Sequence, residues 1–171
     1  MTRSAHREAV GFFEQELSAL PHLPETRHTR EQAIDLRLAL RSSGFRVLPG
    51  GPERILVALR EAEILAEALD DPHRLAQVSR FLSHHFRIIG AHDQAIAAAQ
   101  RALALATASG EVVPMALAHN YLGRIYQTQG DYRRAIDSLG QTVASLEGEQ
   151  RYERFFGQTL LPAVSSRAWL A

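Results

Sequence analysis

An internal repeat of 40 residues limits the folds that this chain can adopt. A shift of 40 superposes Gly50, Gly90 and Gly130, and the apolar and small residues around them recur at spacings of three and four. Such spacings are typical of one face of a helix. Glycine adopts the left-handed conformation that ends a helix without steric cost. Each repeat therefore predicts a helix, a glycine corner and a second helix.

Capping residues predict where the helices begin. Asp71-Pro72 has the form of an N-cap followed by proline, Asp131 can cap a helix from Tyr132, and Thr29 with Gln32 has capping-box spacing. No segment shows the sustained alternation of a strand. We expect an all-α chain with helices near residues 5–19, 29–43, 52–69, 72–89, 92–109, 112–129, 132–147 and 160–170.

The residues of one repeat resemble a known motif. His119-x-x-Leu122-Gly123-x-x-Tyr126, followed by Gly130-Asp131-Tyr132, is similar to the tetratricopeptide (TPR) repeat, with His119 in place of the usual Trp as a packing substitution. The period is 40 residues rather than about 34. Longer helices, as in the repeats of kinesin light chain, would account for the additional residues in each repeat.

The resemblance implies a TPR-like α-solenoid, a right-handed superhelix of antiparallel hairpins with a concave groove. We expect one domain over 1–171, with hairpins at about 29–69, 72–109 and 112–147 and half repeats at about 5–19 and 160–171. The wider sequence is similar to the TPR region of bacterial multidomain class III nucleotide cyclase/ATPase signalling proteins. Their catalytic aspartates and Walker lysine have no counterpart here, so a regulatory or partner-sensing role is implied.

Composition excludes several classes of protein. The chain has 19 arginines, no lysine and 19 acidic residues. It therefore has no net charge that would attract nucleic acid or an anionic membrane. It contains no cysteine and no long apolar run. We therefore expect a cytoplasmic protein without cofactors, disulfides or thiolate chemistry.

The helix register predicts a groove suited to a peptide or partner protein. Arginine forks among amides favour an acidic peptide or a carboxylate, whereas the alternative is a solvated helix face. The predicted groove residues are Gln77, Arg80, His84, Arg87, Asn120, Arg124 and Gln127.

The two ends of the chain predict a second kind of interface. Each end has the pattern of half a repeat, so its apolar face would be open, and we expect self-association or a place within a longer polypeptide. The candidate residues for an oligomer interface, including a homodimer, are Phe13, Leu17, Trp169 and Leu170. An oligomerisation module with an empty groove is therefore the main alternative function, and a small-molecule sensor is a third.

Enzymatic and metal sites are not predicted. The chain has no glycine-rich phosphate loop, nucleophile elbow or HExxH helix. His84 and His85 are adjacent and point to different helix faces, so they lack the spacing of a zinc pair. The sequence indicates a non-catalytic interaction module.

Overall fold

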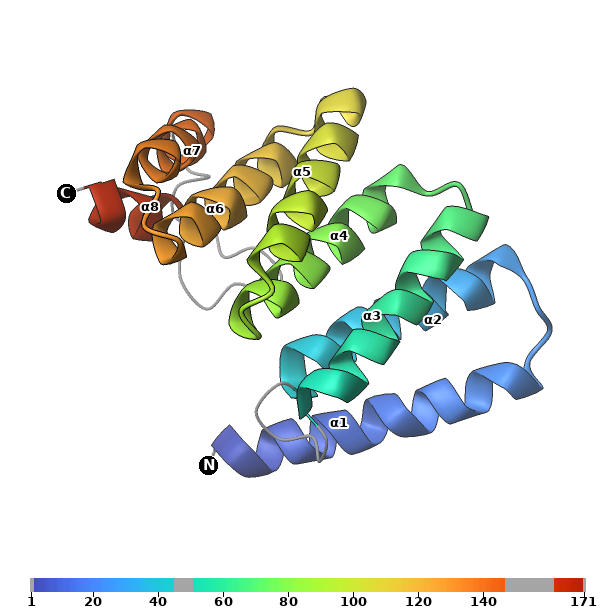
Figure 1. Cartoon of the computed structure of the whole chain (residues 1–171). Coiled ribbons are helices and arrows are strands. Elements are labelled where there is room, and N and C mark those ends of the chain that lie inside the picture. Colours follow the sequence, from blue (N-terminus) through green and yellow to red (C-terminus); the bar gives the residue numbers. More distant parts are fainter. Residues whose placement is uncertain (1, 45–50, 147–161, 171) are drawn as a thin grey trace. The chain divides into compact units, whose positions relative to one another are not determined.

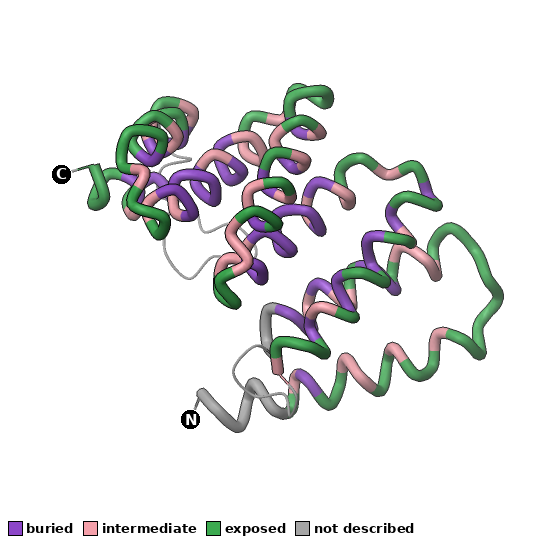
Figure 2. The backbone as a smooth tube through the Cα atoms, in the orientation of Figure 1, coloured by how far each residue is buried: buried purple, intermediate pink, exposed green. Residues whose placement is uncertain are grey.

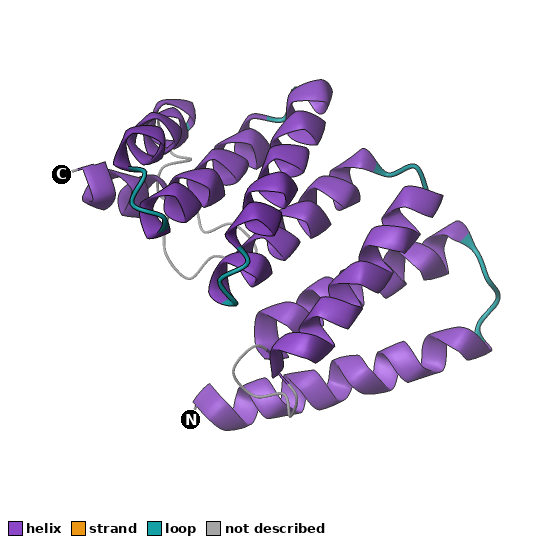
Figure 3. Cartoon of the chain, viewed as in Figure 1, coloured by secondary structure: helices purple, strands orange, loops and turns teal. Residues whose placement is uncertain are grey.

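The computed structural model describes residues 2–44, 51–146 and 162–170, and these residues form helices joined by short turns, with no strand (Figure 3). The helices are α1 (Thr2–Ala19), the 3-10 helix η1 (Leu20–His22), α2 (Arg27–Gly44), α3 (Gly51–Ala68), α4 (Pro72–Ile88), α5 (His92–Ser109), α6 (Val112–Thr128), α7 (Tyr132–Ser145) and α8 (Pro162–Leu170). The predicted all-α class is confirmed. The predicted boundaries agree within three residues, apart from the start at 160, which lies outside the described residues.

Two of the three predicted helix caps are confirmed. The carboxylates of Asp71 and Asp131 accept the backbone N–H groups of Arg74 at 2.9 Å and of Arg134 at 3.1 Å. The capping box predicted at Thr29 is wrong, because α2 begins one turn earlier. Thr26 N–H donates to the Thr29 hydroxyl at 2.9 Å, and Thr29 N–H donates to the Thr26 hydroxyl at 3.2 Å.

The glycine corners at positions 90 and 130 are equivalent in structure as well as in sequence. Gly90 and Gly130 have φ values of +78° and +77°. After each glycine, the next backbone N–H closes the helix end: Ala91 donates to Phe86 O and Asp131 donates to Tyr126 O, both at 2.9 Å. These paired bonds are the closure expected when glycine ends a helix. Gly50 lies outside the described residues.

The chain divides into two compact units, and the first comprises Met1–Phe81. In this unit α2 packs against both α1 and α3 (Figure 1). Its core includes the fully buried side chains of Ile34, Leu38, Ile55 and Leu59. Burial of these side chains on facing helices stabilises the α2–α3 hairpin.

The second unit comprises Leu82–Ala171, and α6 is its central helix. Buried positions occur along much of α6, which packs against α5 and α7 (Figure 2). Gly123 permits close contact with α7, because a Cβ at this position would lie 2.6 Å from Leu139 Cγ. The hydroxyl of Thr142 also donates to Ala116 O at 3.1 Å, which ties α7 to α6.

Consecutive helices in each unit thus pack as hairpins, as expected for a helical repeat of the TPR type. None of the helices in the described part of the chain is both long enough and apolar enough to span a membrane.

Candidate partner-binding site

Two of the predicted groove residues, Gln77 and Arg80, lie in the first unit. The Gln77 side-chain nitrogen lies 2.8 Å from Nε2 of His73, one helical turn earlier. Arg80 is only 6% exposed, and its guanidinium lies 4.4 Å from the ring centroid of Phe81. The guanidinium of Arg41, which is also buried, lies 4.5 Å from the same centroid. Arg80 therefore belongs to a buried cation–π cluster.

The remaining predicted groove residues lie in the second unit, and His84 and Arg87 come from the end of α4. Both side chains are half-buried. The His84 ring makes an edge contact with Tyr121 of α6, with a centroid distance of 5.7 Å. Because His84 and Tyr121 are in contact, the end of α4 and the middle of α6 contribute to the same part of this unit.

Arg87 and Arg124 form the most cationic part of this region. Burial and the nearby positive charge of Arg124 lower the pKa of the Arg87 guanidinium. Arg87 Nε is buried and has no hydrogen-bond partner within the described residues. Arg124 and Gln127, one turn apart on α6, are half-buried. An anion at this position would relieve the like-charge repulsion between Arg87 and Arg124.

Asn120 does not belong to the region around Arg87 and Arg124, because its side chain is buried. Its side chain is 1% exposed and donates a hydrogen bond to the hydroxyl of Ser166 in α8 at 2.9 Å. The polar group is therefore satisfied within the packing between α6 and α8. Helix register alone placed Asn120 beside Arg124, and could not show that α8 covers it.

His119, at the Trp position of the repeat, is half-buried, and burial lowers the pKa of its imidazole. It lines a pocket of about 420 Å³ together with residues of α7, including the exposed Ile136. The predicted packing role fits this half-buried position, and the pocket beside it was not predicted.

The four residues predicted for an oligomer interface differ in exposure. Trp169 and Leu170, at the end of α8, are 58% and 37% exposed. Phe13 and Leu17, on α1, are half-buried. Trp169 and Leu170 therefore form the more accessible apolar pair.

No group of three or more histidine, aspartate and glutamate side chains is arranged to hold a metal ion in the described ranges.

Comparison with known proteins identifies the repeat. Residues 74–148, which run from the first turn of α4 past the end of α7, match the tetratricopeptide repeat family. No curated protein and no solved structure matches the chain. The predicted TPR repeat is thus confirmed over this stretch. Such helical repeats present extended binding surfaces to proteins or peptides and are usually non-catalytic.

Proposed function

We propose that this chain is a non-catalytic module that binds a peptide or partner protein, as a regulatory or scaffolding part of a bacterial signalling protein. The repeat over residues 74–148 supports a protein-binding role. The signalling context rests on the resemblance of the wider sequence to the TPR regions of cyclase/ATPase proteins.

Within the second unit, we propose that Arg87, Arg124 and Gln127 receive an acidic group of the partner, with His84 beside them. The half-buried Arg87 carries this proposal, because its positive charge is close to that of Arg124 and a bound carboxylate would offset this repulsion. A carboxylate can accept hydrogen bonds from guanidinium groups in a bidentate manner, so an acidic peptide fits better than a neutral one. Because the helices are already packed, the site needs little ordering on binding.

A peptide array tests this proposal. The probes are acidic peptides with free C-termini and matched peptides in which Glu and Asp are replaced by Gln and Asn and the C-terminus is amidated. The wild-type chain should retain the acidic peptides preferentially. The double variant Arg87→Gln/Arg124→Gln should bind them about tenfold more weakly or worse, as expected for lost charge-assisted hydrogen bonds.

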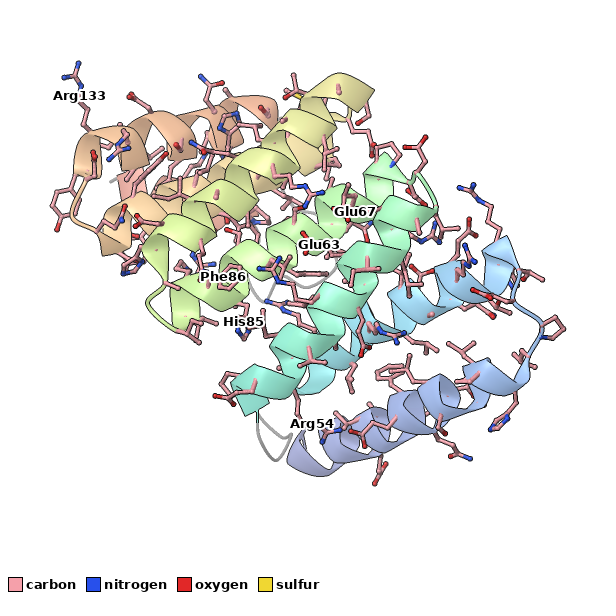
Figure 4. The ribbon with its side chains drawn as sticks, turned by 45° about the vertical axis from the view of Figure 1, so that its right-hand side comes forward. Arg54, Glu63, Glu67, His85, Phe86 and Arg133 are labelled. Carbon is pink, nitrogen blue, oxygen red and sulfur yellow. The ribbon has the colours of Figure 1, made fainter. Side chains whose placement is uncertain are left out.

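The matched control is Arg133→Gln. Arg133 lies on α7, where its side chain extends away from the helix into solvent (Figure 4), and its loss should leave binding unchanged. Arg80 is unsuitable for this test because its replacement would disturb the buried cluster around Phe81. Equal retention of acidic and neutral peptides by the wild type, or unchanged binding by the double variant, would show that this region does not recognise acidic groups.

Self-association is the second candidate function, and the exposed Trp169 favours it. A side chain of this size that is 58% exposed on a nine-residue helix is the kind of residue that anchors interfaces. In this case α8 would bind a second copy of the chain.

A further inference from the structure

A pocket of about 450 Å³ lies within the first unit, lined by residues of α1, α2 and α3. Its aliphatic lining comes from Leu17 of α1, Leu40 of α2, and Val57 and Ala58 of α3. Leu40 and Ala58 are buried, whereas Val57 is 58% exposed. The volume falls in the range of small-molecule sites, and the aliphatic lining suits an apolar ligand body.

Charged side chains also line this pocket, and four of them are paired. Arg54 of α3 donates to Glu14 of α1 at 2.6 Å, and Arg37 of α2 donates to Glu61 of α3 at 2.8 Å. Figure 4 shows Arg54 at the start of α3, beside α1. These two pairs join the three helices around the pocket.

Glu53 is the fifth charged residue of the lining, and it makes no ion pair or hydrogen bond to any part of the chain that the structure describes. Two arginines neutralise Glu14 and Glu61, so among the described lining residues one negative charge, that of Glu53, is uncompensated. An apolar pocket with a single uncompensated carboxylate is complementary to an apolar ligand that carries one positive charge.

We propose that this pocket binds an aliphatic amine, with its alkyl chain against Leu17, Leu40 and Ala58 and its ammonium group beside Glu53. Burial of the alkyl chain supplies most of the affinity, since removal of each methylene from water is favourable. The charge of Glu53 supplies the selectivity for a cation over a neutral or anionic head group. This site is independent of the acidic-peptide site proposed for the second unit.

A small ligand fits the pocket better than the surface of a partner protein does. The ion pairs Glu14–Arg54 and Arg37–Glu61 contain glutamates that are partly exposed. A protein interface over the pocket would remove these charges from water, at a cost that their pairing need not offset. A ligand contained within the pocket leaves them solvated.

Titration of the full chain with three probes of equal chain length tests this proposal. The probes are n-octylamine, n-octanol and octanoate, all below their aggregation concentrations, and binding is followed by calorimetry and by NMR. We expect saturable binding of the amine, at least about threefold tighter than that of the alcohol, since Glu53 is exposed and its charge is partly screened. Octanoate should bind most weakly. Absence of saturable amine binding, or equal binding of octanoate, overturns the proposal.

Substitutions in the lining of the pocket test whether the amine binds there. Ala58→Phe should fill the floor of the pocket and abolish binding, whereas Ala68→Phe, at an exposed position on the same helix, should not. Glu53→Gln needs no repacking and should remove the preference for the amine over the alcohol. If Ala58→Phe fails to fold, the ratio of amine to alcohol affinity in Glu53→Gln alone tests the proposal. An unchanged amine preference in Glu53→Gln, or unchanged binding in folded Ala58→Phe, overturns the proposal.

Discussion

At the scale of single residues, Gly123 controls how closely α6 and α7 approach. A Cβ at this position would lie 2.6 Å from Leu139 Cγ, 2.7 Å from Leu139 Cδ2 and 3.3 Å from the backbone oxygen of Ala135. Leu139 is fully buried and Ala135 O belongs to the helix backbone, so neither can move easily.

We therefore expect Gly123→Ala to destabilise the protein. Overpacking costs about 1–3 kcal/mol, and the gain in helix propensity of about 1 kcal/mol offsets only part of it. The net loss of unfolding free energy, measured by urea denaturation, should be about 1 kcal/mol.

Gly140→Ala is the matched control, because it lies in α7 and nothing is within 4 Å of the added Cβ. At Gly140 only the gain in helix propensity applies, so the free energy of unfolding should rise by about 0.5–1 kcal/mol. If both variants are stabilised equally, close packing at Gly123 is not needed.

Helix register alone does not show which of the predicted binding residues are buried. Arg87 and Arg124 were predicted to share a surface from their register, and the charge of Arg124 does lower the pKa of Arg87. Arg80 and Asn120 were predicted in the same way, yet Arg80 lies against Phe81 and Asn120 against Ser166. Ser166 is 46 residues away in sequence, so no local pattern could reveal this contact.

At the scale of elements, the start of α4 depends on Asp71. This carboxylate accepts the backbone N–H of Arg74 at 2.9 Å and its guanidinium at 2.8 Å, and Arg74 also donates to both oxygens of Asp35 on α2. Burial acts to raise the pKa of Asp71, but the hydrogen bonds and charge of Arg74 outweigh it, so the pKa lies below its ordinary value of 3.8. The cap therefore also connects α4 to α2.

We expect Asp71→Ala to lower the unfolding free energy by about 1 kcal/mol through the loss of the cap. Asp71→Asn keeps an acceptor for the Arg74 N–H and should lose less. Because the folded-state pKa is depressed, the charge contributes stability above the ordinary pKa of the unfolded state, and this contribution disappears as the pH falls through the folded-state value.

Urea denaturation at about pH 7 and at several values below about pH 4 measures this dependence. The difference in stability between the wild type and Asp71→Asn should shrink as the pH falls. A difference that stays constant across this range would contradict the role assigned to the Asp71 charge.

At the scale of the whole molecule, we expect self-association through the apolar residues exposed on α8. Trp169 of α8 is 58% exposed, and a side chain of this type often contributes about 2 kcal/mol or more at an interface. We expect a concentration-dependent sedimentation coefficient for the wild-type chain. Trp169→Ala should weaken the association at least about tenfold.

Tyr132→Ala is the control for this prediction, since Tyr132 is an aromatic residue on α7 with 65% exposure. Its removal should leave the association unchanged. A monomer at every concentration would count against self-association, and an unchanged association in Trp169→Ala would exclude this residue of α8 from the interface.

The helices, their corners and the repeat can be predicted from local sequence patterns, because these features depend on contacts within a few residues. The closures after Gly90 and Gly130 and the caps at Asp71 and Asp131 are local features of this kind. Local patterns could not predict which polar side chains are buried or where a pocket forms. Burial depends on neighbours that are distant in sequence, as when α8 covers Asn120 or when α1, α2 and α3 together line the pocket beside Glu53.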